Sequence, residues 1–207
     1  MMQKLRWFLV GAMTPLLVSA VGGLIFLKTR ANGFSAQTQP SALEEFAAQS
    51  ARSLALSGDA KGKQNPVPDS SDVLAEARAH WADHCATCHA NDGSGENTMG
   101  RQMYPPAPDM RKDRTQRMTD GELFYIIENG IRLSGMPAWG SGTDKGSLDS
   151  WKLVHFIRHL PALSADEMKE MEKMNPKSPA DLEEERQEEE FLKGKTPSAA
   201  PKEHHHH

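Results

Sequence analysis

One short motif constrains this chain more than any other feature. The segment reads Cys85-Ala86-Thr87-Cys88-His89, and it contains both cysteines of the 207-residue sequence. Two thiols at C-x-x-C-H spacing are able to add to the two vinyl groups of one haem, and the adjacent histidine is then held under the iron as an axial ligand. We therefore expect one covalently bound haem c, held by Cys85 and Cys88 and ligated by His89.

Two other chemistries also use closely spaced cysteines. A zinc site would need His84 as a fourth ligand beside the three residues of the motif, and four ligands so close in sequence make a strained tetrahedron. A thioredoxin-like redox pair requires a surrounding βαβ pattern, and we see no alternating strand pattern in the chain. Haem attachment is the interpretation that fits best.

A haem iron in an electron carrier needs a second axial ligand from the protein. Among eleven methionines, Met136 lies in Gly135-Met136-Pro137-Ala138-Trp139-Gly140, where glycine and proline predict a stiff, extended loop. We expect its thioether to bind the iron, which favours the ferrous state and raises the reduction potential. Met103 and Met99 are reserve ligands, and the alternative for Met136 is a loop methionine that fills the core.

Capping patterns predict an all-α domain over residues 71–162. Ser71 is expected to cap a helix of about 72–84, Thr119 with Glu122 forms a capping box for a helix of about 120–129, and Ser147 opens a third helix that ends at Pro161. Loops rich in glycine and proline separate these three helices.

The region from about 72 to 161 resembles class I c-type cytochromes. The matching features are Trp81 before the first cysteine, the C-x-x-C-H motif after the first helix, Gly-Met-Pro, and an aromatic-rich last helix, all in the family's order. The resemblance implies an all-α fold around one haem, with the first and last helices crossing. Ala90 departs from it, because glycine commonly follows the motif histidine.

The same resemblance implies two further haem contacts. A backbone carbonyl of Pro105 or Pro106 is expected to accept the ring N–H of His89, which would fix the ring orientation. Trp139 is expected to donate its indole N–H to a haem propionate, with simple core packing as an equal alternative. We include Pro106 and Trp139 among the expected cofactor-binding residues.

Residues 1–30 read as a membrane anchor. Trp7 to Leu27 carries no charge and as a helix would reach about 32 Å, enough to cross a hydrocarbon core of about 30 Å. Lys4 and Arg6 favour a cytoplasmic N-terminus, which would put the haem domain on the exported, periplasmic side of the cytoplasmic membrane. The alternative is a signal peptide cleaved after Val18-Ser19-Ala20.

Two extensions flank the predicted haem domain. Residues 31–70 read as a linker with one amphipathic helix, capped by Ser41 and Glu44, and this helix either spaces the domain from the membrane or packs on it. Residues 163–207 read as an acidic helical tail, opened by Ser164 with Glu167, with a disordered end. The terminal histidines 204–207 are either a tag remnant or native.

Taken together, these features predict a membrane-tethered monohaem electron carrier with no acid–base catalytic residue. Its partners would be an electron donor and an acceptor of a respiratory chain, and a formal charge of −4 argues against nucleic-acid binding. One alternative is a fixed cytochrome subunit of a larger membrane complex. A second is a haem sensor in which Met136 does not stay on the iron.

Overall fold

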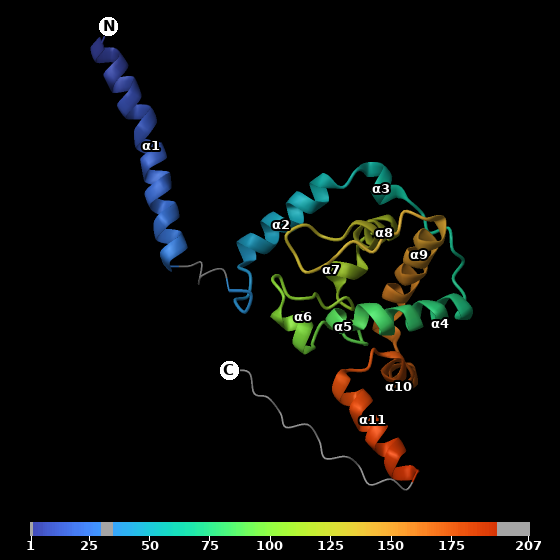
Figure 1. Ribbon diagram of the computed structural model, residues 1–207. Helices are drawn as coiled ribbons and strands as arrows, with labels where there is room; N and C mark the ends of the chain where they lie inside the picture. Colours follow the sequence, from blue (N-terminus) through green and yellow to red (C-terminus); the bar gives the residue numbers. More distant parts are fainter. Residues whose placement is uncertain (1, 30–34, 194–207) are drawn as a thin grey trace.

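The structure is a computed structural model that describes residues 2–29 and 35–193. Over these ranges the chain forms helices and no strand, which confirms the all-α prediction (Figure 1). The disordered end and the histidines 204–207 of the sequence analysis lie outside the described residues. The helices are α1 (Met2–Thr29), α2 (Ala42–Ala55), α3 (Gly58–Gly62), α4 (Ser71–His80), a π-helical turn (Trp81–Cys85), α5 (Ala86–His89), α6 (Thr98–Gln102), α7 (Asp113–Gln116), α8 (Asp120–Asn129), α9 (Asp144–His159), a 3₁₀ turn (Leu160–Ala162), α10 (Ala165–Met174) and α11 (Pro179–Leu192).

Helix α1 contains the predicted membrane anchor. Its stretch Arg6–Thr29 has a mean hydropathy of 2.0, and none of its most apolar window is buried against the rest of the protein. Twenty-four helical residues reach about 36 Å, which exceeds the hydrocarbon thickness of a bilayer. The helix is therefore long and apolar enough to cross a membrane once, which supports a single-pass protein.

The domain core forms where α4 and α9 pack together with the π-helical turn. Trp81 is 2% exposed and Phe156 is 0% exposed, and their ring centroids lie 5.5 Å apart. Phe124 of α8 stacks on Trp151 of α9 with centroids 4.0 Å apart. Ala77 of α4 is completely buried. This crossing of the first and last helices of the haem domain is the arrangement that the resemblance implied.

Two helix starts differ from the prediction by a few residues. Helix α4 begins at Ser71, because the side chain of Ser70 accepts a hydrogen bond from the Val73 N–H. Helix α9 begins at Asp144 and not near Ser147, because Thr143 caps it by accepting from the Gly146 N–H. In both cases an earlier hydroxyl provides the cap.

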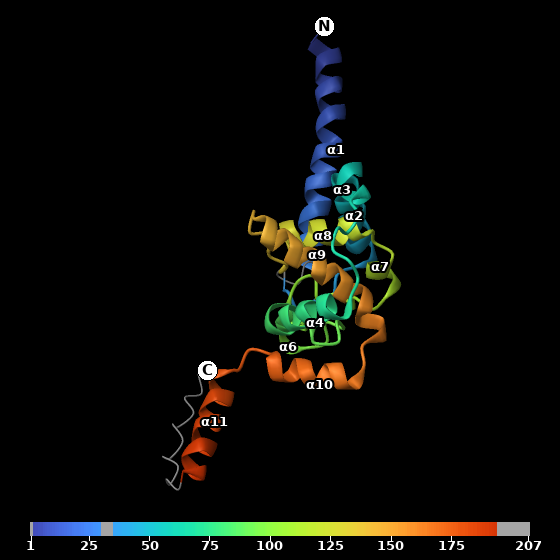
Figure 2. The same cartoon turned by 90° about the vertical axis from the view of Figure 1, so that its right-hand side faces the viewer.

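The first tail helix belongs to the packed interior. Figure 2 shows α10 lying across α4, while α11 extends away from the domain. Met171 of α10 is 0% exposed and lies in the same core as Trp81. Glu167 accepts from Arg78 of α4 at 3.1 Å and lies 2.9 Å from His159 of α9. The core thus continues beyond residue 162, where the sequence analysis ended the domain.

The second half of the linker also packs on the domain. The Asn65 side chain donates to the Trp151 carbonyl at 2.9 Å, and a ring nitrogen of His155 lies 2.8 Å from the Val67 carbonyl. Val67 is 9% exposed. Residues 65–68 are therefore a strap across α9 rather than a free spacer.

Candidate functional site

The C-x-x-C-H motif lies where α4 passes through a π-helical turn into α5. The turn spans Trp81–Cys85, and the Ala86 N–H bonds to the Trp81 carbonyl five residues earlier. Cys88 then follows Cys85 by three residues, with most of this step inside α5. Two residues at this helical spacing share a face, so both thiols point to the same side of the helix.

Both cysteines are neutral thiols at ordinary pH. Burial, with a smaller contribution from Cys88, raises the pKa of Cys85 to about 12. Burial also raises the pKa of Cys88. His84 does not join them: its Nδ1 lies 2.9 Å from Asp83, and within residues 2–29 and 35–193 no three His, Cys, Asp or Glu residues gather as metal ligands. The zinc alternative therefore has no support in the structure.

His89 is held in the form that iron requires. Its side chain is 9% exposed, and burial lowers its pKa to about 4, so the ring is neutral at physiological pH. Among the described residues, Nδ1 is one of the few enclosed polar atoms without a hydrogen-bond partner, whereas Nε2 is neither hydrogen-bonded nor enclosed. One ring nitrogen is thus free and accessible for an axial bond.

The expected bond from His89 to a proline carbonyl is not present. In the described part of the chain no acceptor reaches Nδ1 of His89, so the expectation for Pro105 or Pro106 was wrong for this structure. The turn is held by other bonds: the Tyr104 hydroxyl donates to Glu44 at 3.0 Å, and the Ala107 N–H donates to the Gly100 carbonyl at 2.9 Å. These bonds fix the turn to α2 and to α6 instead.

Two residues that the sequence analysis missed hold the backbone of the motif. The Asn97 side chain donates to the carbonyls of Ala86 at 2.9 Å and Thr87 at 3.0 Å. The same side chain accepts from the Gly100 N–H at 2.7 Å. Gly95 adds a bond from its N–H to the His89 carbonyl at 2.9 Å. Sequence reasoning had no local signal for this role, because the bonds from Asn97 reach ten and eleven residues back along the chain, farther than the side-chain bonds to nearby backbone that Asn commonly makes.

Trp81 fixes the backbone at the end of the motif. Its indole N–H donates to the Ala90 carbonyl at 3.0 Å, and its ring centroid lies 5.8 Å from that of His89. Ala90 has φ 59° and ψ 162°, a conformation that glycine adopts freely and that strains a residue with a Cβ. This backbone requirement explains why glycine is common at this position in the family.

Met136 lies in a loop that backbone bonds fold against α8. The Ile131 N–H donates to the Met136 carbonyl at 3.1 Å, and the Trp139 N–H donates to the Ile127 carbonyl at 3.0 Å. Gly130 turns the chain with φ 66°, and a Cβ there would come within 2.6 Å of Pro137. Met136 is half-buried and is not among the residues that form or pack against the core around Trp81.

The reserve ligand Met103 lies beside the same loop. A Cβ on Gly135 would collide with the sulfur of Met103, which places that sulfur against the residue preceding Met136. Met99 is 51% exposed. Of the three candidate sulfurs, the structure thus brings Met103 and the Met136 loop together.

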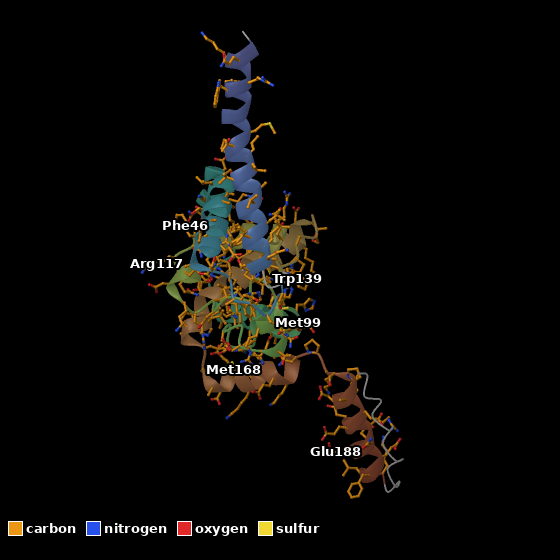
Figure 3. All side chains as sticks on the ribbon, turned by 90° about the vertical axis from the view of Figure 1, so that its left-hand side faces the viewer. Phe46, Met99, Arg117, Trp139, Met168 and Glu188 are labelled. Carbon is orange, nitrogen blue, oxygen red and sulfur yellow. The ribbon has the colours of Figure 1, made fainter. Side chains whose placement is uncertain are left out.

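Trp139 is not part of the core. It is 41% exposed, and its ring centroid lies 5.6 Å from that of His84. The core-packing alternative for Trp139 is therefore contradicted. Leu133 is 94% exposed, and Figure 3 shows Trp139 and Met99 on the same edge of the domain. Leu133 and Trp139 come from one loop and Met99 from α6, and all three leave apolar surface exposed.

The observed features fit a covalent haem. Two neutral thiols share a helix face, a neutral histidine keeps one nitrogen accessible, and the large apolar side chains of Leu133 and Trp139 are exposed. A flat, apolar macrocycle attached through two thioethers would satisfy all three. By contrast, the open cavity of about 470 Å³ beside α8 is lined by residues such as Lys63, Glu128 and Ser147 and by none from the motif.

Comparison with known families agrees with this site. The family described as cytochrome C oxidase, cbb3-type, subunit III matches residues 72–157. This segment is a c-type cytochrome domain. A c-type cytochrome domain carries covalently bound haem c and acts in electron transfer. Curated proteins offer no match to the chain.

Proposed function

We propose that this protein is a membrane-tethered monohaem cytochrome that passes single electrons between redox partners on the exported side of the membrane. The observation that carries the proposal is His89: a buried, neutral imidazole with one accessible nitrogen, directly after two thiols on one helix face. Cys85 and Cys88 form the thioethers. His89 and Met136 are the axial ligands.

The haem supplies one reversible electron between ferric and ferrous iron. The chain's own residues set the conditions for that exchange. Burial keeps His89 unprotonated, so no proton competes for its accessible nitrogen. Asn97 fixes the backbone within the motif and Trp81 fixes it directly after the motif, which limits reorganisation around the site. Met136 would hold the iron together with His89, and iron ligated by both side chains would have no position left for a substrate.

Helix α1 supports the tether. Its apolar stretch is long enough to span a bilayer, and Lys4 and Arg6 precede it, which favours an N-terminus on the cytoplasmic side. A tether confines the domain near membrane-bound partners and raises their effective concentration. The haem domain then lies on the exported side of the membrane, which is the side where c-type haem attachment takes place.

The test uses the full-length holoprotein in lipid nanodiscs. We expect a pyridine haemochrome spectrum of haem c, one reversible one-electron wave in a redox titration, and no spectral change when carbon monoxide is added to the reduced protein at neutral pH. Carbon monoxide binding would contradict the proposed role as an electron carrier and favour a haem sensor with a labile sixth ligand. A haem-free or two-electron centre would overturn the proposal altogether.

A fixed subunit of a larger complex is the second candidate. The matching family is described as an oxidase subunit, and α11, whose residues are not buried, is free to contact another protein. Affinity purification from native membranes separates the two candidates. A stoichiometric membrane partner that stays bound would favour the subunit, whereas isolation of the cytochrome alone would favour the shuttle.

A further inference from the structure

Helix α2 carries its apolar residues on the side that faces away from the domain. Leu43, Phe46 and Leu54 are 75%, 69% and 87% exposed. At 100° per residue these three fall on one face together with Ala47 and Ser50, and no charged residue shares that face. Figure 3 shows Phe46 at the outer edge of the molecule.

The opposite, polar face of α2 contacts the cytochrome domain. Glu44 accepts from the Tyr104 hydroxyl at 3.0 Å, and Glu45 lies 3.6 Å from Arg114. After the helix, the Lys61 ammonium donates to the Ser53 carbonyl at 2.7 Å. A surface helix of a soluble protein normally turns its apolar stripe inward and its charges outward. Helix α2 does the reverse, so the cytochrome domain does not cover its apolar face.

The length of chain before α2 indicates what the apolar face of α2 contacts. Residues 30–41 separate α2 from α1, and even fully extended they reach no more than about 43 Å. Lys28 lies in the last turn of α1, so a cation that attracts anionic headgroups marks the end of the apolar span that α2 follows. A helix whose apolar and charged residues lie on opposite faces is typical of helices that lie in the membrane interface.

We propose that α2 lies in the headgroup region of the membrane that α1 crosses, with Leu43, Phe46 and Leu54 among the acyl chains. The opposite face of α2 contacts Tyr104 and Arg114 of the cytochrome domain. Helix α2 then fixes the orientation of the haem domain on the membrane. This inference rests on the proposed tether. It goes beyond that tether by assigning a second contact with the bilayer.

Site-directed spin labelling tests the proposal in the full-length holoprotein. Cys85 and Cys88 are consumed by haem attachment, so Phe46→Cys or Leu54→Cys provides a single free thiol, and unsubstituted protein is the labelling blank. The protein is placed in nanodiscs of phosphatidylethanolamine and phosphatidylglycerol. Collisions of the nitroxide with oxygen, which concentrates in lipid, are compared with collisions with a water-soluble nickel chelate.

Two reference positions calibrate the measurement. Val18→Cys on α1 reports a lipid environment, and Leu182→Cys on α11, an equally apolar residue that is 54% exposed, reports water. We expect labels at 46 and 54 to follow 18, with an oxygen-to-nickel collision ratio several-fold above that at 182. A second substitution, Phe46→Glu in the Leu54→Cys background, should return the ratio at 54 toward the water value.

Each other outcome overturns the proposal in a distinguishable way. Water-like labels at 46 and 54 with a lipid-like label at 18 reject the interfacial helix and leave the tether intact. A water-like label at 18 rejects the tether itself. Low collision rates with both reagents, together with spin–spin broadening between labels at 46, would show that a second copy covers the helix.

Discussion

The two sides of the cytochrome domain are built differently. On the side where α4 crosses α9, Trp81 and Phe156 are 2% and 0% exposed, and α10 adds Met171 to the same core. On the side of the loop that carries Met136, Leu133 is 94% exposed and Trp139 is 41% exposed. The crossing of α4 and α9 is closely packed, whereas the loop that carries Met136 leaves large apolar side chains exposed.

This difference indicates which half depends on the cofactor. Covering several hundred Å² of porphyrin at about 25 cal/mol per Å² contributes on the order of 10 kcal/mol as an upper value. That gain would fall mainly on the loop side, where the apolar side chains are uncovered. The helical side draws its stability from contacts already made within the chain. The following substitutions test this division.

The largest effect is expected from removing the haem. In Cys85→Ala/Cys88→Ala no thioether forms, and the domain loses stabilisation on the order of 10 kcal/mol. Hydrogen exchange should show full exchange across residues 131–142 and residual protection confined to α4 and α9. A haem-free domain that unfolds cooperatively and protects residues 131–142 would contradict the claim that the loop side depends on the haem.

A matched pair of truncations compares the two sides in the holoprotein. Phe156→Ala should lower the free energy of unfolding by about 3–5 kcal/mol, because it leaves a cavity in a closed core. Leu133→Ala should lower it by a smaller amount, about 1–2 kcal/mol, because a side chain that is 94% exposed within the chain itself has only the haem to pack against. Denaturant titration measures both. A loss at Leu133 as large as that at Phe156 would refute the proposed division.

The attachment of α10 should be sensitive to acid. Burial alone would raise the pKa of Glu167, but hydrogen bonds from Ser164 and His159 lower it to about 2. A lowered folded-state pKa gives stability that is present above the usual value near 4.5 and is lost as the pH falls toward 2. Glu167→Gln should remove about 1–2 kcal/mol at neutral pH and flatten this dependence.

Glu170→Gln is the control for that substitution. Glu170 also pairs with Arg78, at 2.7 Å, but its side chain is 52% exposed. Its loss should stay below about 1 kcal/mol. Equal effects of the two substitutions in pH-dependent unfolding would show that the bonds to Ser164 and His159 do not matter.

The smallest expected effect is a gain. Ala90→Gly removes the Cβ from a residue at φ 59° and should raise the free energy of unfolding by about 1 kcal/mol. Ala86→Gly, within α5, is the control and should lower stability by about 1 kcal/mol, because glycine disfavours helix. Thermal unfolding followed at the haem absorption band reports both. A loss at Ala90 would show that this backbone is unstrained.

Local sequence signals predicted the helices well. The capping boxes predicted at Ser41, Thr119 and Ser164 are all present, because capping depends on residues only three positions apart. The burial of Met171 was missed, because it depends on where α10 packs after the turn that follows α9. The apolar face of α2 was predicted as a helix face, but its outward direction follows only from Glu44 and Glu45 meeting the domain.

The candidate site divides in the same way. The motif itself is contiguous, so Cys85, Cys88 and His89 followed from sequence alone. The positioning role of Asn97 and the position of Met103 beside Gly135 required the fold, because they join segments on separate loops. The bond expected from Pro105 or Pro106 came from resemblance and is not formed here.

The central claim is that iron is held by His89 and by the sulfur of Met136, with both thiols bound to the same haem. Proton NMR of the reduced, full-length holoprotein tests it most directly, since the haem ring current strongly displaces the signals of a bound methionine. We expect one such methionine, lost in Met136→Ala and retained in Met103→Ala and Met99→Ala. A displaced methionine that persists in Met136→Ala, or none in the unsubstituted protein, would contradict the account.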